Sequence, residues 1–160
     1  MHPTHNDLPA KTRAAVCAAL SELSIDAIDL FTQIKQAHWN VKGPTFIALH
    51  ELFDKVAEEA EEWGDELAER IVQLGGTALG TARYVAKNTT LPEYPATAVR
   101  GHEHVEAVSA ALAAFGKRVR AGIDDCDKLG DADAADICTE ISRCVDKQLW
   151  FVESHSRKFA

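Results

Sequence analysis

The sequence predicts an all-α fold in which four long helices form one bundle, and it predicts a single domain over residues 1–160. Only nine glycines and five prolines occur in 160 residues, whereas alanine, leucine and glutamate are abundant, and this composition favours helix. Apolar residues recur with a helical period in four segments. The connections between these segments are short, long and short in turn, which is typical of a four-helix bundle with one crossover.

The first helix is expected to begin near Asp7-Leu8-Pro9, after a short tail of residues 1–8. Aspartate can cap a helix, and proline suits its first turn. The helix should continue to the region of Asn40, because Lys42-Gly43-Pro44 then breaks the pattern. Its helical period is carried by Leu20, Leu23, Leu30, Phe31 and Ile34.

The second helix is expected over residues 45–74, where Gly75-Gly76 ends it. The next connection, residues 77–95, has no sustained period, and it contains the breakers Gly80, Pro92 and Pro95. A structureless loop of this length is unusual in a compact domain. We therefore expect a crossover that runs the length of the bundle and can include one short helical turn.

The third helix should begin near Thr97 and end near Leu129. The sequence Gly130-Asp131-Ala132-Asp133 then turns the chain. A fourth helix is expected from this turn to about Arg157. The crossover therefore lies between the second and third helices.

Charge and composition limit the classes of function. The formal net charge of −8 disfavours nucleic acid as a partner, because phosphate binding needs clustered Lys and Arg, and it favours cations. No apolar run is long enough to cross a bilayer, and residues 1–10 do not resemble a signal peptide, so we expect a cytoplasmic protein. Buried thiols are expected at the four cysteines, which show no C-x-x-C spacing.

The second helix carries one histidine and five carboxylates on a single stripe, about 100° wide at 100° per residue. This acidic stripe contains no Lys or Arg and consists of His50, Asp54, Glu58, Glu61, Asp65 and Glu69. Like charges four residues apart destabilise a helix by a few tenths of a kcal/mol per pair. The stripe is therefore either a solvated face or a site that binds a cation. Carboxylates with imidazole suit iron(II), manganese or zinc better than calcium.

His38 shares a helical stripe with Phe31 and Ile34, so it is either a packed core residue or a metal ligand. His38 and His50 lie on helices joined by a short turn and can therefore approach each other. No Glu-x-x-His motif occurs in the chain, although the usual diiron centre inside such a bundle requires it. A metal would therefore bind at an outer face or at a two-fold subunit boundary, where an isologous contact makes the site twice.

The stretch from Gln36 to Gly76 resembles the Dps family, the mini-ferritins named for DNA protection during starvation. The resemblance is carried by H-W-N-x-x-G-P-x-F-x-x-x-H-x-x-F-D, which starts at His38, followed by D-x-x-A-E-R-x-x-x-L-G-G, which starts at Asp65. The last helix adds Asp-Lys-x-x-Trp, which ends at Trp150. The resemblance implies a ferritin-like four-helix bundle that assembles into a hollow dodecamer.

The resemblance also implies a ferroxidase that oxidises iron(II), preferably with hydrogen peroxide, and stores ferric mineral inside the shell. Its diiron site would lie between two subunits. Matching the family's motif residue by residue, one subunit would supply His38, His50 and Asp54, and its two-fold partner would supply Asp65 and Glu69.

Other residues receive accessory roles from the same resemblance. Trp39 matches the family tryptophan beside the site, where it would intercept an oxidising radical. Glu58 and Glu61 would attract iron or seed mineral. An acidic pore for iron would be formed by Asp131, Asp133, Asp136 and Glu140 near the start of the fourth helix; the alternative is a solvated helix N-terminus.

The family's DNA function is not expected for this chain. We therefore expect a cytoplasmic location in preference to association with the nucleoid. Residues 1–10 contain no Lys or Arg, and Arg157 and Lys158 are too few for a basic footprint. His2 and His5 are expected in a disordered tail. A DNA-compacting protein and a non-catalytic helical assembly protein remain the rival classes.

A second histidine cluster lies at the start of the third helix. His102 and Glu106 are four residues apart and could share a metal, with Glu103 and His104 beside them. We expect an ordinary surface cluster here.

Overall fold

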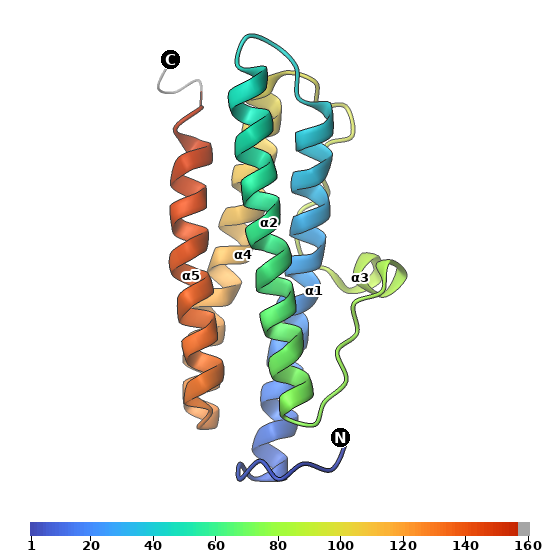
Figure 1. Cartoon of the computed structure of the whole chain (residues 1–160), viewed down its shortest axis with the longest axis vertical. Coiled ribbons are helices and arrows are strands. Elements are labelled where there is room, and N and C mark those ends of the chain that lie inside the picture. Colours follow the sequence, from blue (N-terminus) through green and yellow to red (C-terminus); the bar gives the residue numbers. More distant parts are fainter. Residues whose placement is uncertain (157–160) are drawn as a thin grey trace.

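The computed structural model describes residues 1–156, which form five helices. These are α1 (Ala10–Asn40), α2 (Phe46–Gln73), α3 (Ala82–Asn88), α4 (Gly101–Leu129) and α5 (Ala132–Glu153). Figure 1 shows α1, α2, α4 and α5 side by side in one bundle, with the short α3 beside it on the crossover. The predicted all-α bundle is confirmed. Over the described residues, no helix is long and apolar enough to cross a membrane.

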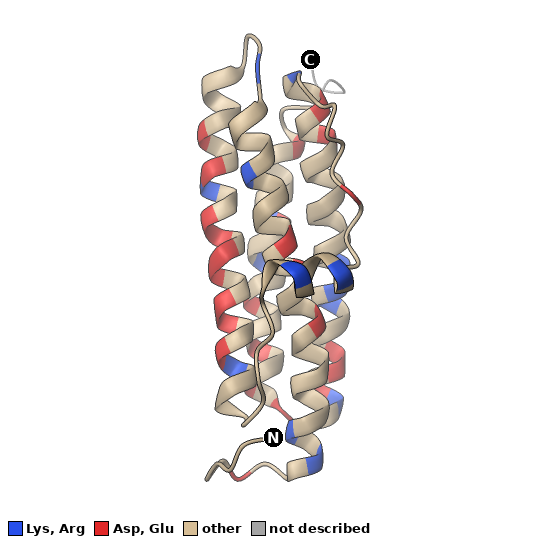
Figure 2. Ribbon diagram, turned by 90° about the vertical axis from the view of Figure 1, so that its right-hand side faces the viewer, with Lys and Arg blue, Asp and Glu red and all other residues tan. Residues whose placement is uncertain are grey.

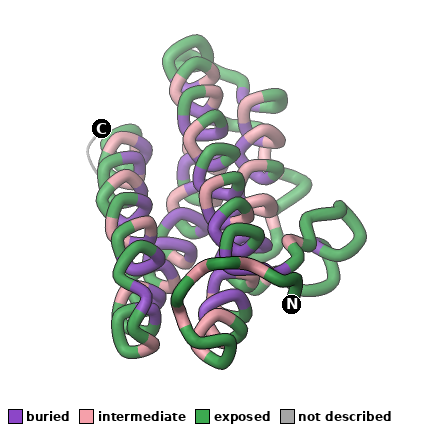
Figure 3. Tube along the Cα trace, turned by 60° about the horizontal axis from the view of Figure 1, so that its bottom comes forward, coloured by how far each residue is buried: buried purple, intermediate pink, exposed green. Residues whose placement is uncertain are grey.

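The core lies where the four long helices face one another, and Figure 3 shows the buried residues turned inward along each of them. Phe53 of α2 and Phe115 of α4 are fully buried. Phe115 also stacks on Trp63, with ring centroids 5.9 Å apart. Three of the four thiols are buried, as expected, while Cys144 is half-buried.

The crossover runs along the bundle as predicted, and it contains the seven-residue helix α3. Asp26 of α1 holds it in place and is completely buried. Its carboxylate accepts hydrogen bonds from the backbone N and the hydroxyl of Thr90, both at 2.8 Å, and it pairs with Arg118 Nε at 2.7 Å. The crossover is therefore fastened to both α1 and α4.

One predicted helix boundary is wrong, and another falls outside the described residues. The third long helix begins at Gly101 and not near Thr97, because Ala98 N donates to Pro95 O in a turn and the Glu103 carboxylate caps the helix start. The fourth long helix ends at Glu153. The predicted end at Arg157 lies outside the described residues.

Residues 1–8 form no helix, in line with the predicted tail, but they pack against the end of α2. His2 N donates to Gly75 O at 2.6 Å, and its ring hydrogen-bonds Thr77 Oγ1 at 3.3 Å. Arg13 donates to Leu74 O at 3.0 Å. The N-terminal segment is thus folded back on the bundle, contrary to the disordered tail expected for His2.

Candidate metal centre

The end of α1 and the start of α2 bring two imidazoles together. The rings of His38 and His50 stack with centroids 3.8 Å apart and an interplanar angle of 19°. Gly43, in the turn between the helices, has φ +120°, which a glycine tolerates readily. The predicted approach of the two histidines is therefore confirmed.

Each histidine is oriented by the backbone of the opposite helix. His38 Nδ1 lies 2.8 Å from His50 O, and His50 Nδ1 lies 2.9 Å from His38 O. A carbonyl oxygen only accepts hydrogen bonds, so in each neutral ring Nδ1 carries the proton. The lone pair is then on Nε2, which is the arrangement that metal-binding histidines use.

Asp54 lies one helical turn beyond His50 and pairs with Lys35 of α1. Lys35 Nζ is 2.6 Å from Asp54 Oδ1, and His38 Nδ1 is 3.7 Å from the same oxygen. The hydrogen bond from Lys35 is the main reason that the pKa of Asp54 is lowered. The carboxylate is consequently ionised and half-exposed, so a cation can reach it by displacing Lys35.

The ion pair relieves part of the charge on the acidic stripe, because Lys35 neutralises Asp54 at one end of it. The stripe itself contains no Lys or Arg, and this lysine comes from α1. Lys35 lies three residues before His38, a spacing that places both on one helix face. That spacing was the signal in the sequence that could have revealed the pair.

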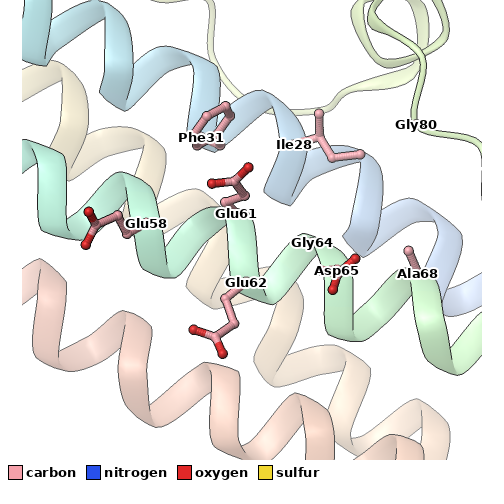
Figure 4. A pocket seen from close by; sticks show the side chains of 9 residues that line it. All are labelled: Ile28, Phe31, Glu58, Glu61, Glu62, Gly64, Asp65, Ala68 and Gly80. Carbon is pink, nitrogen blue, oxygen red and sulfur yellow. The ribbon is translucent and has the colours of Figure 1, made fainter.

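The middle of the acidic stripe borders an open cavity of about 680 Å³ between α1, α2 and the crossover. Figure 4 shows carboxylates at its wall beside apolar side chains of α1. The lining residues are Ile28, Phe31, Glu58, Glu61, Glu62, Gly64, Asp65, Ala68 and Gly80. Figure 2 shows acidic residues along most of α2. Glu58, Glu61 and Asp65 are therefore brought to one surface, apart from the histidine pair.

Asp65 and Glu69 cannot join the histidines within one chain. At 1.5 Å per residue they lie about 22 Å and 28 Å along α2 from His50. Within residues 1–156, no group of three or more His, Cys, Asp or Glu side chains could hold a metal ion. A site that uses all five predicted ligands therefore requires a second chain.

Trp39 follows His38 and is 67% exposed, the largest exposed fraction among the large apolar side chains described. It lines a second open cavity, which also includes Gln36 and Tyr94. The side chain therefore lies at the surface of the single chain, where it faces residues of the crossover.

The four predicted pore acids have different environments. Asp131 is 2% exposed, accepts from Ala134 N at 3.1 Å and pairs with Arg70 Nη2 at 2.6 Å. It caps α5 and its charge is neutralised by Arg70, and its predicted pore role stays a prediction. Asp133, Asp136 and Glu140 are exposed on α5, although Asp133 also lies 3.4 Å from Arg70.

The second histidine cluster is not wholly at the surface. His104 is completely buried and hydrogen-bonded to the Tyr94 hydroxyl, so the predicted surface position is wrong for this residue. His102 is half-buried and Glu106 is exposed. His104 precedes Val108 and Ala111 at helical spacing, and this pattern could have placed it in the core.

Comparisons with known proteins agree with this architecture. A ferritin-like domain model matches residues 17–160. A DNA protection during starvation protein of Agrobacterium fabrum is 46% identical over 96% of this chain and 95% of its own length.

Two solved structures are also similar. Dps from Microbacterium arborescens, solved in a high iron form, has 34% identity and a TM-score of 0.86, covering 95% of this chain and 97% of its own. Mycobacterium smegmatis Dps has 29% identity and a TM-score of 0.91, with coverages of 97% and 93%.

Proposed function

Because the chain belongs to the ferritin-like family, as one of its Dps proteins, we propose that it is an iron-oxidising and iron-storing protein of the cytoplasm. Iron(II) is its substrate, hydrogen peroxide is the preferred oxidant, and ferric mineral is its cargo. Twelve chains enclose the mineral in a hollow shell. The activity protects the cell from oxidative damage.

The observation that carries this proposal is the reciprocal hydrogen bonding of His38 and His50. Both Nδ1 atoms are occupied by backbone carbonyls, so both Nε2 atoms are left to bind iron. Asp54 supplies a carboxylate beside them. The two-fold partner brings its Asp65 and Glu69 to complete each site, and the symmetry produces two such sites per dimer.

Each side chain has a distinct task in this site. The imidazoles bind and orient iron(II), and the backbone carbonyls keep them in the required tautomer. The Asp54 carboxylate binds the metal after the ammonium group of Lys35 has been displaced. Two iron(II) ions held together can each give one electron to one peroxide molecule, which avoids releasing hydroxyl radical. Few, exchangeable oxygen and nitrogen ligands let the ferric product leave.

The remaining acidic residues assist the movement of iron. Glu58 and Glu61 attract iron or seed mineral at the acidic stripe. Asp133, Asp136 and Glu140 form the acidic route into the shell, because a channel lined by one sign of charge raises the local concentration of the opposite ion.

Stopped-flow absorbance tests this function. Anaerobic protein loaded with iron(II) is mixed with hydrogen peroxide, and the formation of ferric product is followed. In His38→Ala/Asp65→Ala the rapid phase should fall by about tenfold or more, since the variant removes a ligand from each half of the site.

The matched control is His102→Ala/Asp124→Ala, which changes the same residue types outside the proposed site; Asp124 is exposed on α4. It should retain the native rate. Both variants are first checked for native assembly by light scattering. Equal rates in the native protein and the ligand variant would refute the ferroxidase proposal.

A further inference from the structure

A buried tyrosine–histidine pair joins the crossover to α4, and the proposed ferroxidase site does not use it. The Tyr94 hydroxyl and His104 Nδ1 form a short hydrogen bond, and the two rings stack with centroids 6.1 Å apart. His104 is completely buried. Its Nε2 has no hydrogen-bond partner within the described residues.

Burial keeps both partners of this hydrogen bond neutral, and the phenol O–H is a stronger donor than an imidazole N–H. Burial raises the pKa of Tyr94 and lowers that of His104, so the resting pair is a neutral phenol and a neutral imidazole. The phenol donates to Nδ1, which leaves the ring proton on Nε2. The backbone carbonyls of Val99 and Asn40 offset part of the effect of burial on the pKa of His104, because they favour the charged form of the imidazole.

Such a pair suits the loss of one electron from the phenol. Removing an electron makes the phenolic proton strongly acidic, so the proton moves readily to a base that is already hydrogen-bonded to it. His104 Nδ1 is already hydrogen-bonded to the hydroxyl. Proton transfer can therefore accompany electron loss without any rearrangement.

Tyr94 and Trp39 line the same open cavity. The cavity has a volume of about 640 Å³ and is lined by Trp39, Gln36 and Tyr94, among others. Trp39 is the more exposed of the two aromatic residues, whereas Tyr94 is half-buried. Tyr84, the other tyrosine of the chain, lies on α3 and is exposed. Tyr94 is thus the phenol that shares a cavity with the exposed indole.

We propose that Tyr94 and His104 form a proton-coupled electron-donor site that reduces Trp39 after Trp39 has lost one electron. Tyr94 gives one electron to the indole radical cation, and its O–H bond breaks as the proton moves to His104 Nδ1. The products are a neutral Trp39, a Tyr94 phenoxyl radical and a His104 imidazolium. The radical thereby moves from the exposed indole of Trp39 to the half-buried phenol of Tyr94.

The first oxidant is a one-electron oxidant of the hydroxyl-radical class, which becomes hydroxide when it oxidises Trp39. Its origin in the cell rests on the proposed iron and peroxide chemistry. The donor site itself does not, so it can be tested in iron-free protein. Failure of the donor site and failure of the ferroxidase can then be told apart.

Pulse radiolysis of the iron-free assembly provides this test. Azidyl radical is the oxidant and becomes azide, and transient absorption follows the indolyl and phenoxyl radicals. In the native protein the indolyl signal should decay as the phenoxyl signal grows, and the transfer should slow in D₂O. Tyr94→Phe should lose this growth, whereas the matched control Tyr84→Phe should keep it.

Two further variants test the other partners. Electron transfer from Tyr94 to the indole radical should be lost in Trp39→Phe. The matched control Trp150→Phe should retain it. His104→Gln keeps a hydrogen-bond acceptor but removes the base, so transfer should be slower and its D₂O effect should be lost. Circular dichroism and light scattering confirm that each variant folds and assembles.

Three results would overturn the proposal. One is phenoxyl growth that survives in Tyr94→Phe and disappears in Tyr84→Phe. Another is native transfer in Trp39→Phe. The third is a native rate and isotope effect in His104→Gln, which would exclude His104 as the proton acceptor.

Discussion

His38 and His50 show how the backbone prepares side chains for metal binding at the residue scale. Each ring is held by a carbonyl of the opposite helix, so the geometry of the turn also sets the tautomer. The sequence predicted that the two residues approach, because both flank a Gly-Pro break. It could not predict the reciprocal hydrogen bonds, which depend on how the two helix ends are rotated.

At the proposed site, the Lys35–Asp54 ion pair would compete with iron for the same carboxylate. A solvent-accessible ion pair contributes about 0.2–1 kcal/mol. Lys35→Gln should therefore strengthen binding of the divalent ion by up to about fivefold. Anaerobic calorimetric titration measures this change in affinity. Cobalt(II) takes the place of iron(II) in the titration, because it is not oxidised in peroxide-free buffer.

Lys55→Gln is the matched control for that titration, because Lys55 neighbours Asp54 along α2 and is exposed. The control should change the affinity less than Lys35→Gln does. Weaker cobalt binding in Lys35→Gln would show that the lysine supports the metal site and does not compete with it.

At the element scale, the sequence predicted four long helices and the crossover because helical periods and glycine or proline breaks coincide. The start of α4 was misplaced since Glu103 caps it from within, and this cap delays the helix to Gly101. The buried pairing of Asp131 was not predicted because its partner, Arg70, is distant in sequence and comes from α2. A local cap therefore accounts for the first difference, and a contact between remote segments accounts for the second.

Alanine substitutions at Gly75 and Gly130 test whether the N-terminal segment packs against the end of α2. Both have φ +85°, but an added Cβ would lie 2.6 Å from His2 O at Gly75 and would meet nothing within 4 Å at Gly130. Left-handed backbone costs a non-glycine residue about 1–2 kcal/mol. Both alanine variants should lose that much stability, and Gly75→Ala should lose more because His2 must move.

Denaturant unfolding of the two variants, followed by circular dichroism, compares these losses at equal protein concentration. The difference between the variants isolates the contact with residues 1–8. Equal losses would mean that the N-terminal segment does not rest on the end of α2 in solution.

At the scale of the whole molecule, acidic residues dominate the surface, with a net charge of −8. Figure 2 shows them gathered along α2. The name of the Agrobacterium relative refers to DNA, but residues 1–10 of this chain carry no Lys or Arg. Arg157 and Lys158 lie outside the described residues. The net negative charge is the reason that we propose iron chemistry, and not DNA binding, for this chain.

The acidic route into the shell is tested by Asp136→Asn/Glu140→Gln. Loss of its charge should slow iron uptake by about tenfold at low salt, since electrostatic steering raises association rates by at least that factor. Uptake is followed by ferric absorbance at limiting iron(II). Glu153→Gln, exposed at the other end of α5, is the control. An uptake rate unchanged from the native one would remove these two residues from the route.

The central claim is that each iron site is shared between two chains, and co-assembly of two inactive variants tests it most directly. His38→Ala/His50→Ala lacks one half of the site, and Asp65→Ala/Glu69→Ala lacks the other. Neither variant should oxidise iron rapidly by itself. Random pairing in a purified mixed assembly should restore about a quarter of the native sites, because half of the dimers are mixed and each of these has one intact site.

Stopped-flow absorbance with peroxide, on mixed assemblies verified by two affinity tags, gives the answer. Recovery of about a quarter of the native rapid phase is the predicted result. A verified mixed assembly with no recovery, or a single variant with full native activity, would contradict a site shared between subunits.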